Sequence, residues 1–280
     1  MFELTPKELT ALMLILMHDN LREQSIFTID NIIKLMNLKS TSREQKFIKD
    51  LLQKLKDKHY IELHSKPQII EKYILGDISS INKNDFVYMT KTEKMRLDDN
   101  FTLLYDEEIF KILNYSKEPI NNYSMLQLFG YLIKSISNNA LNDDYLLCYP
   151  SYKDMNDKFG LSESTISKYI DILQEIDLIR CDYTGIEQLA SGKIKNTKMY
   201  YCRAKDEQAL IEKIEYERKE KGFIKLNKKT KDDSNLKRSI TQRINYLENK
   251  LKQNTITETE TITLNELKKV DYRGLYNKHL

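Results

Sequence analysis

Residues 149–183 read YPSYKDMNDKFGLSESTISKYIDILQEIDLIRCDY, and this stretch decides the fold. Met155 and Phe159 are spaced as in a short helix with one buried face. Gly160 then supplies a turn, and Ser162 is a preferred N-cap for the helix that follows. The pattern predicts a helix-turn-helix. The inward face of its second helix is expected at Ile166, Tyr169, Ile170 and Leu173.

A β-hairpin is predicted directly after the second helix. Its strands are expected from Leu178 to Tyr183 and from Met199 to Arg203, with a polar, lysine-bearing loop between them. Helix, turn, helix and basic hairpin in this order are typical of a winged helix. Such a fold leaves short polar side chains on one exposed helical face beside a positive loop, which fits a DNA major groove.

The outward side chains of residues 163–175 are mostly small hydroxyls, with one lysine. Hydroxyls can exchange hydrogen bonds with base edges and phosphates, and a lysine can neutralise a phosphate or bind guanine. Residues 191–203 carry further lysines and no acid. An ordinary solvated helix face and a solvated loop are the alternatives left open. The DNA-binding residues predicted in this region are Ser162, Ser164, Thr165, Ser167, Lys168, Lys193, Lys195, Asn196 and Lys198.

The N-terminal region repeats the same order of elements. A helix is expected from Pro6 to Asp19, and Thr28 caps a short second helix. A longer helix from about Ser42 to Lys58 precedes strands at 60–63 and 86–89. A second, degenerate winged helix is therefore predicted. The first helix is expected to bury Leu9, Leu12, Met13 and Leu16.

The outward face of the long helix is a second candidate DNA surface, because arginine and glutamine side chains can bind base edges. A packing or dimer role for the same face is the alternative, since Glu44 and Asp50 intervene. The DNA-binding residues predicted here are Ser42, Arg43, Gln45 and Lys46.

The remaining segments complete a mostly α fold with small β-hairpins. Helices are expected at 106–113, at 123–137, where almost every position is apolar, and from Asp206 to about Lys221. An apolar stripe from Leu236 to Leu251 predicts a last helix that either packs on the chain itself or forms a dimer zipper. No element is assigned to 255–280. The predicted organisation is a winged-helix-like domain at 1–90, a connector at 91–104, a second winged-helix domain at 105–222 and a helical tail at 223–280.

Charge is distributed unevenly along the chain. The net charge is only +3, but residues 223–280 carry 13 Lys/Arg against 7 Asp/Glu, so the tail has a net charge of +6 and the rest −3. No segment approaches the ~20 apolar residues of a membrane span. Glu3 and Glu8 interrupt the N-terminal apolar run, which argues against a signal peptide. We expect a cytoplasmic protein that makes no membrane contact.

The sequence offers no catalytic constellation. The four histidines form no H-x-H or H-E-x-x-H cluster, and the Gly192-Lys193 pair lacks the spacing of a P-loop. Three isolated cysteines show no metal-binding spacing and suit a reducing compartment. We therefore expect neither enzyme activity nor a cofactor or metal site.

Residues 101–222 resemble the winged-helix domains of plasmid, phage and conjugative-element proteins from low-GC Gram-positive bacteria. The resemblance rests on three sequence segments: FTLLYDEEIFKIL, YPSYKDMNDKFGLSESTISKYIDILQEIDLI, and a G-K-x-x-N-x-x-x-Y-Y motif at the end of the predicted wing. The resemblance implies sequence-specific binding of double-stranded DNA, with recognition-helix positions at Ser164, Thr165, Ser167 and Lys168. Several such proteins are replication initiators and others are regulators.

Three functions follow as hypotheses. The first is a replication initiator of a plasmid or other mobile element, which would bind A+T-rich or repeated origin sites, dimerise and recruit replication machinery through its basic tail. The second is a transcriptional regulator that uses the same DNA contacts. The third is a winged-helix scaffold that binds proteins, which the near-neutral total charge keeps open.

Overall fold

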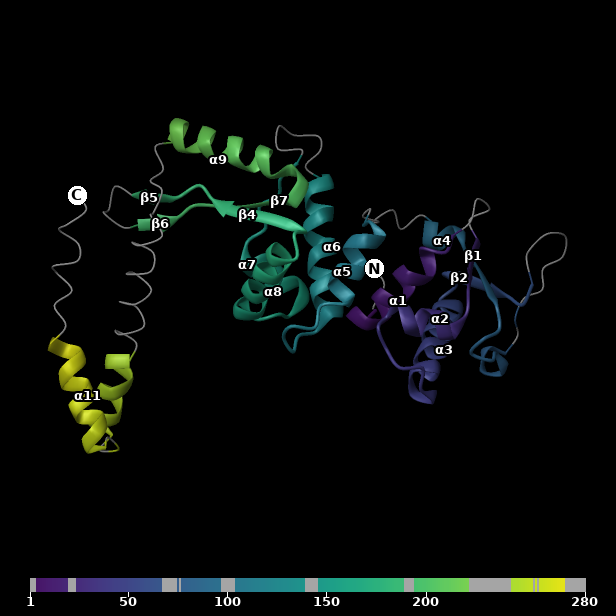
Figure 1. Ribbon diagram of the computed structural model, residues 1–280, viewed down its shortest axis with the longest axis horizontal. Coiled ribbons are helices and arrows are strands. Elements are labelled where there is room, and N and C mark those ends of the chain that lie inside the picture. Colours follow the sequence, from purple (N-terminus) through teal and green to yellow (C-terminus); the bar gives the residue numbers. More distant parts are fainter. Residues whose placement is uncertain are drawn as a thin grey trace. The chain divides into compact units, whose positions relative to one another are not determined.

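The computed structural model describes residues 4–19, 24–66, 75, 77–96, 104–138, 146–188, 194–221, 243–253, 255 and 257–269. The chain divides into two compact units. The first contains residues 1–183 and 198–216, and the second contains 184–197 and 217–280. The described residues form mostly helices with small antiparallel sheets, as the sequence predicts (Figure 1). The predicted domain boundaries, after residues 90, 104 and 222, remain a prediction, which this division into units does not test.

The first unit begins with a helix, a strand, two helices and two strands. The strands form one antiparallel sheet in the order β1-β3-β2. The strand β1 was not predicted, because four residues next to a chain turn carry too little periodicity to identify. The elements are α1 (Pro6–Leu16), β1 (Gln24–Phe27), α2 (Ile29–Leu35), α3 (Ser42–Asp57), β2 (Ile61–His64), the 3-10 turn η1 (Ile78–Ser80) and β3 (Val87–Lys91).

The same order then recurs in the first unit. Cys148 pairs with Tyr201 of β7 in an isolated bridge, and β7 pairs with β4. Cys148, β7 and β4 therefore correspond in order to β1, β3 and β2. The predicted helix and hairpin positions are confirmed here. The elements are α5 (Asp106–Leu113), α6 (Asn122–Asn138), α7 (Tyr152–Phe159), α8 (Glu163–Glu175), β4 (Ile179–Tyr183) and β7 (Met199–Arg203). A short helix, α4 (Glu93–Arg96), lies in the predicted connector.

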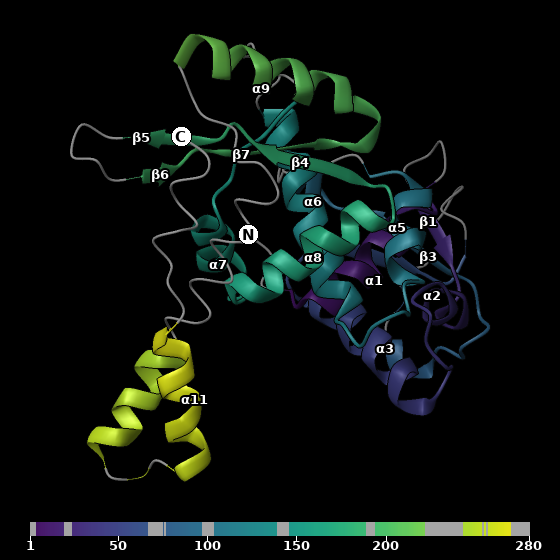
Figure 2. The same ribbon diagram turned by 60° about the vertical axis from the view of Figure 1, so that its left-hand side comes forward.

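One continuous apolar core joins the two sets of elements. Residues of α1 and α6 pack together, which explains why α6 is apolar almost all round (Figure 2). The same contact corrects the predicted inward face of α1. Ala11, Leu14 and Ile15 are fully buried, whereas the predicted Leu9 and Met13 are only half-buried. A helix that is covered on two sides loses the single apolar stripe on which the prediction depended.

Polar contacts reinforce this junction at the turn between α2 and α3. The Tyr123 hydroxyl donates to the Met36 carbonyl at 3.2 Å, and the Asn37 side-chain amide donates to the Leu113 carbonyl at 3.4 Å. Asn37 is itself in the left-handed region, with φ 58°. The end of α2 is therefore held by α5 and α6.

The second unit has a hairpin of its own where a simple loop was expected. Its strands are β5 (Ile186–Gln188) and β6 (Ile194–Asn196). Gly185, with φ 139°, pairs with Thr197 through backbone and hydroxyl contacts. The helix α9 (Glu207–Lys221) follows β7, and its Leu210 and Ile214 pack on Tyr200 and Cys202.

The described residues in the C-terminal part of the second unit form two helices. Residues 243–252 are helical, and α11 spans Glu258–Lys269, in a region to which the sequence analysis assigned no element. Leu247 and Leu264 are buried, at 0% and 2% exposure. Of the predicted stripe, Leu236 and Ile240 lie outside the described residues, and Leu251 is exposed.

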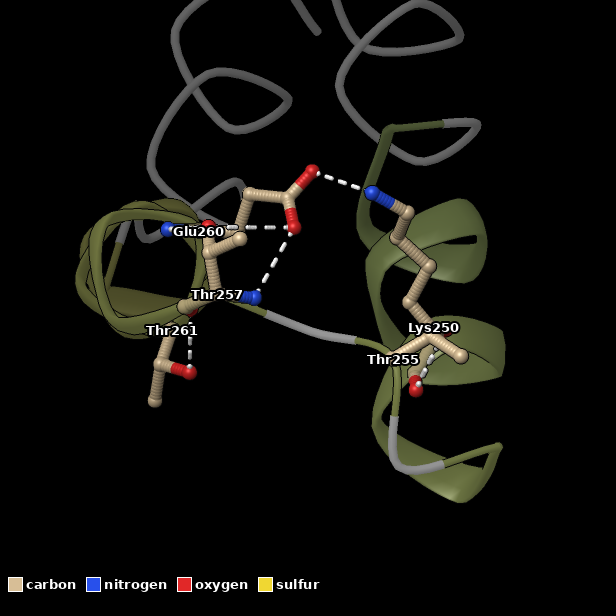
Figure 3. A network of polar contacts seen from close by, with 5 residues as sticks. All are labelled: Lys250, Thr255, Thr257, Glu260 and Thr261. Atoms are coloured by element: carbon tan, nitrogen blue, oxygen red, sulfur yellow. Dashed lines mark hydrogen bonds and ion pairs between the residues drawn. The ribbon is translucent and has the colours of Figure 1, made fainter.

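A polar network connects the two helices (Figure 3). Lys250 pairs with Glu260 at 2.6 Å, and Glu260 also accepts from the Thr257 backbone N–H at 3.0 Å. The Thr257 hydroxyl accepts from the Glu260 N–H in return, which completes a capping box at the start of α11. Hydrogen bonding to Lys250 and Thr257 lowers the pKa of Glu260 to about 2. Among the described helices, none has the length and apolar character that crossing a bilayer requires.

Candidate nucleic-acid interface

The first candidate surface is the start of α3. The Thr41 hydroxyl caps the helix by accepting from the Glu44 N–H at 3.3 Å. Ile48, Leu51, Leu52 and Leu55 are buried on the opposite face. Of the predicted contact residues, Ser42, Arg43 and Lys46 are exposed and Gln45 is half-buried.

The charge of α3 favours binding to a polyanion. The helix carries five Lys/Arg against three Asp/Glu, a net charge of +2. Two of the pairs that tie it to α1 are Lys7 with Glu44 at 2.5 Å and Lys54 with Glu8 at 3.1 Å. Within the described part of the chain, Arg43 and Lys46 make no ion pair. Their charges therefore face solvent without an ion-pair partner among the described residues.

The middle of α3 is partly covered by the segment at η1. Ile78 is buried against the helix, and Lys49 Nζ donates to the Ser79 carbonyl at 2.7 Å. Asp77 accepts from the Ser79 N–H at 2.8 Å, and these bonds to Ser79 lower the pKa of Asp77. A shallow groove of about 460 Å³ is left between helix and segment. It is lined by Ser42, Gln45, Lys46, Lys49, Asp50, Gln53, Asp77, Ile78 and Ser79.

The second candidate surface is the start of α8. Ser162 caps the helix as predicted, since its hydroxyl accepts from the Thr165 N–H at 3.2 Å. The same oxygen lies 2.9 Å from the Ser164 hydroxyl and 2.8 Å from the Thr165 hydroxyl. Ser162 and Ser164 are exposed, and Thr165 is half-buried. The result is a compact group of three hydroxyls at the helix N-terminus.

Ser167 differs from these three. It is half-buried near Tyr152 of α7, whose pKa is raised mainly by burial. The four predicted core residues of α8, namely Ile166, Tyr169, Ile170 and Leu173, are all buried. Because Ser167 is half-buried, its hydroxyl is less available to a ligand than those of Ser162 and Ser164.

Lys168 contradicts the expectation of a free lysine on this face. Its Nζ lies 2.7 Å from the Glu118 carboxylate, and both side chains are about half exposed, at 44% and 50%. Lys117 pairs with Glu175 in the same region. Lys168 is the sole basic residue of α8, against three acids, so the helix has a net charge of −2. The sequence argument missed Glu118 because it lies about 50 residues before its partner.

The hairpin lysines are only partly described. Lys193 lies outside the described residues, and of Lys195 and Asn196 only the backbone is described, in β6. Lys195 stands opposite Glu187 in the strand register, which places an acidic position beside the predicted basic loop. Lys198 is exposed, and its ammonium lies 4.1 Å from the ring centre of Tyr149.

Tyr149 is a surface aromatic that the sequence argument did not select. The residue is 43% exposed, and its ring packs edge-on against Tyr200, with ring centres 5.7 Å apart. A cation–aromatic contact of this kind restrains Lys198 at the base of the hairpin.

Within the described residues, no group of three or more His, Cys, Asp or Glu side chains is placed to hold a metal ion.

Comparison with known proteins adds one structural likeness. No family model matches the chain, and no curated protein matches it. Among solved structures, the chain is similar to the crystal structure of RctB domains 2-3, at 14% sequence identity. The match covers 73% of this chain and 83% of that chain, with a TM-score of 0.34. A TM-score this low does not establish a shared fold.

Proposed function

We propose that this chain binds double-stranded DNA through two winged helices in tandem, as a binding protein and not an enzyme. The proposal is supported by the recurrence, within the first unit, of a helix, a strand or single bridge, two helices and two strands. In each set the last helix, α3 or α8, has a side-chain N-cap. The turn before it contains one residue with a positive φ, Asn37 before α3 and Gly160 before α8. This is the element order in which a helix enters a major groove.

The exposed cations at the start of α3 carry the proposal. Arg43 and Lys46 are one helical turn apart and have no acidic partner in the described residues. An arginine or lysine in that place can neutralise a phosphate or bind guanine through its O6 and N7 atoms. The hydroxyl group at the start of α8 supplies further donors and acceptors, as the resemblance of residues 101–222 implies.

Duplex binding is tested by fluorescence anisotropy with a pool of random 30-base-pair duplexes at several salt concentrations. Affinity should fall as salt rises, with a slope of log K against log salt near −0.9 for each phosphate contacted. Selection from the pool should then enrich a defined sequence. Absence of binding at low salt would rule out the DNA-binding proposal.

We further propose that the biological role is replication initiation at a mobile element, with regulation of transcription as the competing role. The tandem arrangement and the net charge of +6 in residues 223–280 support a protein that holds DNA and contacts other machinery. Footprinting on the DNA that flanks the gene separates the two roles. Clustered direct repeats are expected for an initiator, whereas one promoter operator would indicate a regulator.

A protein-binding scaffold is the second candidate function, and the charge of α8 favours it. A helix with a net charge of −2 whose lysine already has a carboxylate partner is a poor polyanion site. If the chain failed to shift any duplex while capturing a basic peptide through α8, the scaffold would replace DNA binding as the function of that surface.

A further inference from the structure

The connection between α5 and α6 lies along the exposed side of α8. Lys117 pairs with Glu175 near the end of α8, and the Asn122 side-chain amide donates to the Leu113 and Tyr115 carbonyls at 3.0 Å. Between these anchors, Glu118 reaches Lys168 at 2.7 Å. The carboxylate is therefore placed by contacts on both sides of it, through residues that precede and follow it in the chain.

Lys168 is the one basic side chain that α8 can offer to a phosphate. A carboxylate and a phosphate are both oxygen anions that accept hydrogen bonds from an ammonium group. Because both partners are about half exposed, water screens the pair and the contact is easily exchanged. An approaching DNA strand would compete with Glu118 for the same ammonium and would meet its negative charge.

We propose that Glu118 competes with DNA for Lys168. When no duplex is bound, its carboxylate occupies the position that a phosphate of the DNA backbone would take. This inference rests on the proposed DNA binding and deepens it. It gives the α5–α6 connection a role in setting the affinity of α8 for the DNA backbone. The three hydroxyls at the start of α8 are outside the competition, since they contact one another and not Glu118.

The test is Glu118→Gln in the full chain, with anisotropy titrations of the selected duplex across salt. Removing the competing charge should tighten binding roughly two- to five-fold at low salt, as for release of one exposed ion pair. The slope of log K against log salt should steepen by up to about 0.9, because Lys168 then gains a full phosphate contact. Adding Lys168→Gln to Glu118→Gln should abolish the gain.

The matched control is Glu107→Gln. Glu107 is exposed on α5 and forms no ion pair within the described residues, so the substitution removes the same charge without freeing a lysine. Equal effects of the two glutamate variants, or a gain that survives Lys168→Gln, would overturn the role of Glu118 while leaving DNA binding intact. No binding by the wild-type chain at low salt would overturn both.

Discussion

The helices α3 and α8 occupy equivalent places in the two halves of the first unit and differ in charge. Each follows a turn with a positive φ and begins at a hydroxyl cap, Thr41 or Ser162. The helix α3 has a net charge of +2, whereas α8 has −2. Equivalent position in a repeated fold therefore does not give equivalent chemistry.

The two helices also differ in what covers them. The segment at Asp77–Ser79 contacts the middle of α3, and Glu118 contacts the middle of α8. In both cases the first turn of the helix stays accessible. It offers cations in α3 and hydroxyls in α8. Cations supply affinity that is largely independent of sequence, whereas hydroxyls near base edges supply selectivity. We expect the two helices to divide these tasks.

The largest expected effect concerns the shared core. Leu52→Ala in α3 and Leu173→Ala in α8 each remove a fully buried side chain and should cost roughly 2–5 kcal/mol of unfolding free energy. Because one core joins both halves, each variant should lower the stability of both. Hydrogen exchange of the amides in α3 and α8 measures this. Loss of protection in only the mutated half would show that the halves fold independently.

Arg43→Gln with Lys46→Gln should give the next largest effect. Each substitution removes a cation that faces solvent, and each lost base or phosphate contact should cost roughly 1–3 kcal/mol of binding free energy. Titrations across salt should also show a flatter slope. Lys111→Gln with Lys205→Gln removes two exposed lysines elsewhere and serves as the control. If both pairs behave alike, α3 is not the DNA surface.

Thr165→Ala should have a smaller effect of a different kind. Loss of one hydroxyl at the start of α8 should weaken binding to the preferred sequence by about 1 kcal/mol, comparable to one hydrogen bond. Binding to random duplex should change little, so the base preference relaxes. Thr165→Ser keeps the hydroxyl and should behave like wild type. An equal loss on all sequences would mean that Thr165 contacts only phosphate.

The smallest expected effect is the release of the segment that covers α3. Bonds to Ser79 hold the pKa of Asp77 below its usual 3.8, so its support for the segment is present above that pH and is lost as pH falls through the lowered value. Asp77→Asn should mimic the protonated state at neutral pH. We expect faster amide exchange at Ser79 with little change in overall stability. Unchanged exchange would show that Lys49 and Ile78 hold the segment without Asp77.

The sequence predicted local structure well and long-range electrostatics poorly. The helix at 106–113, the Ser162 cap and the hairpin strands of the second half follow from short-range spacing and capping, and the structure has them where expected. By contrast, the partner of Lys168 and the cover over α3 come from chain segments distant in sequence. Helical periodicity identifies which face points outward but carries no information on what else lies there.

The β5–β6 hairpin and the helix α11 were not predicted for a related reason. β5 and β6 have three residues each, and α11 begins with alternating Thr and Glu, which form a capping box only once Thr257 and Glu260 meet. The inward face of α1 was misplaced because Ala11 and Leu14 contact elements on two sides. Such features depend on tertiary contacts that a single sequence does not display.

The packing of α1 against α6 has a consequence for how the chain can be divided. If the backbone were cleaved between Arg96 and Leu104, the fragments would stay associated through Ile15, Phe129 and their neighbours. Made separately, each fragment would present these apolar side chains to water and aggregate, yet co-expression should restore a soluble pair. A recombination event that exchanged one half between related genes would therefore succeed only when α1 and α6 remained mutually compatible.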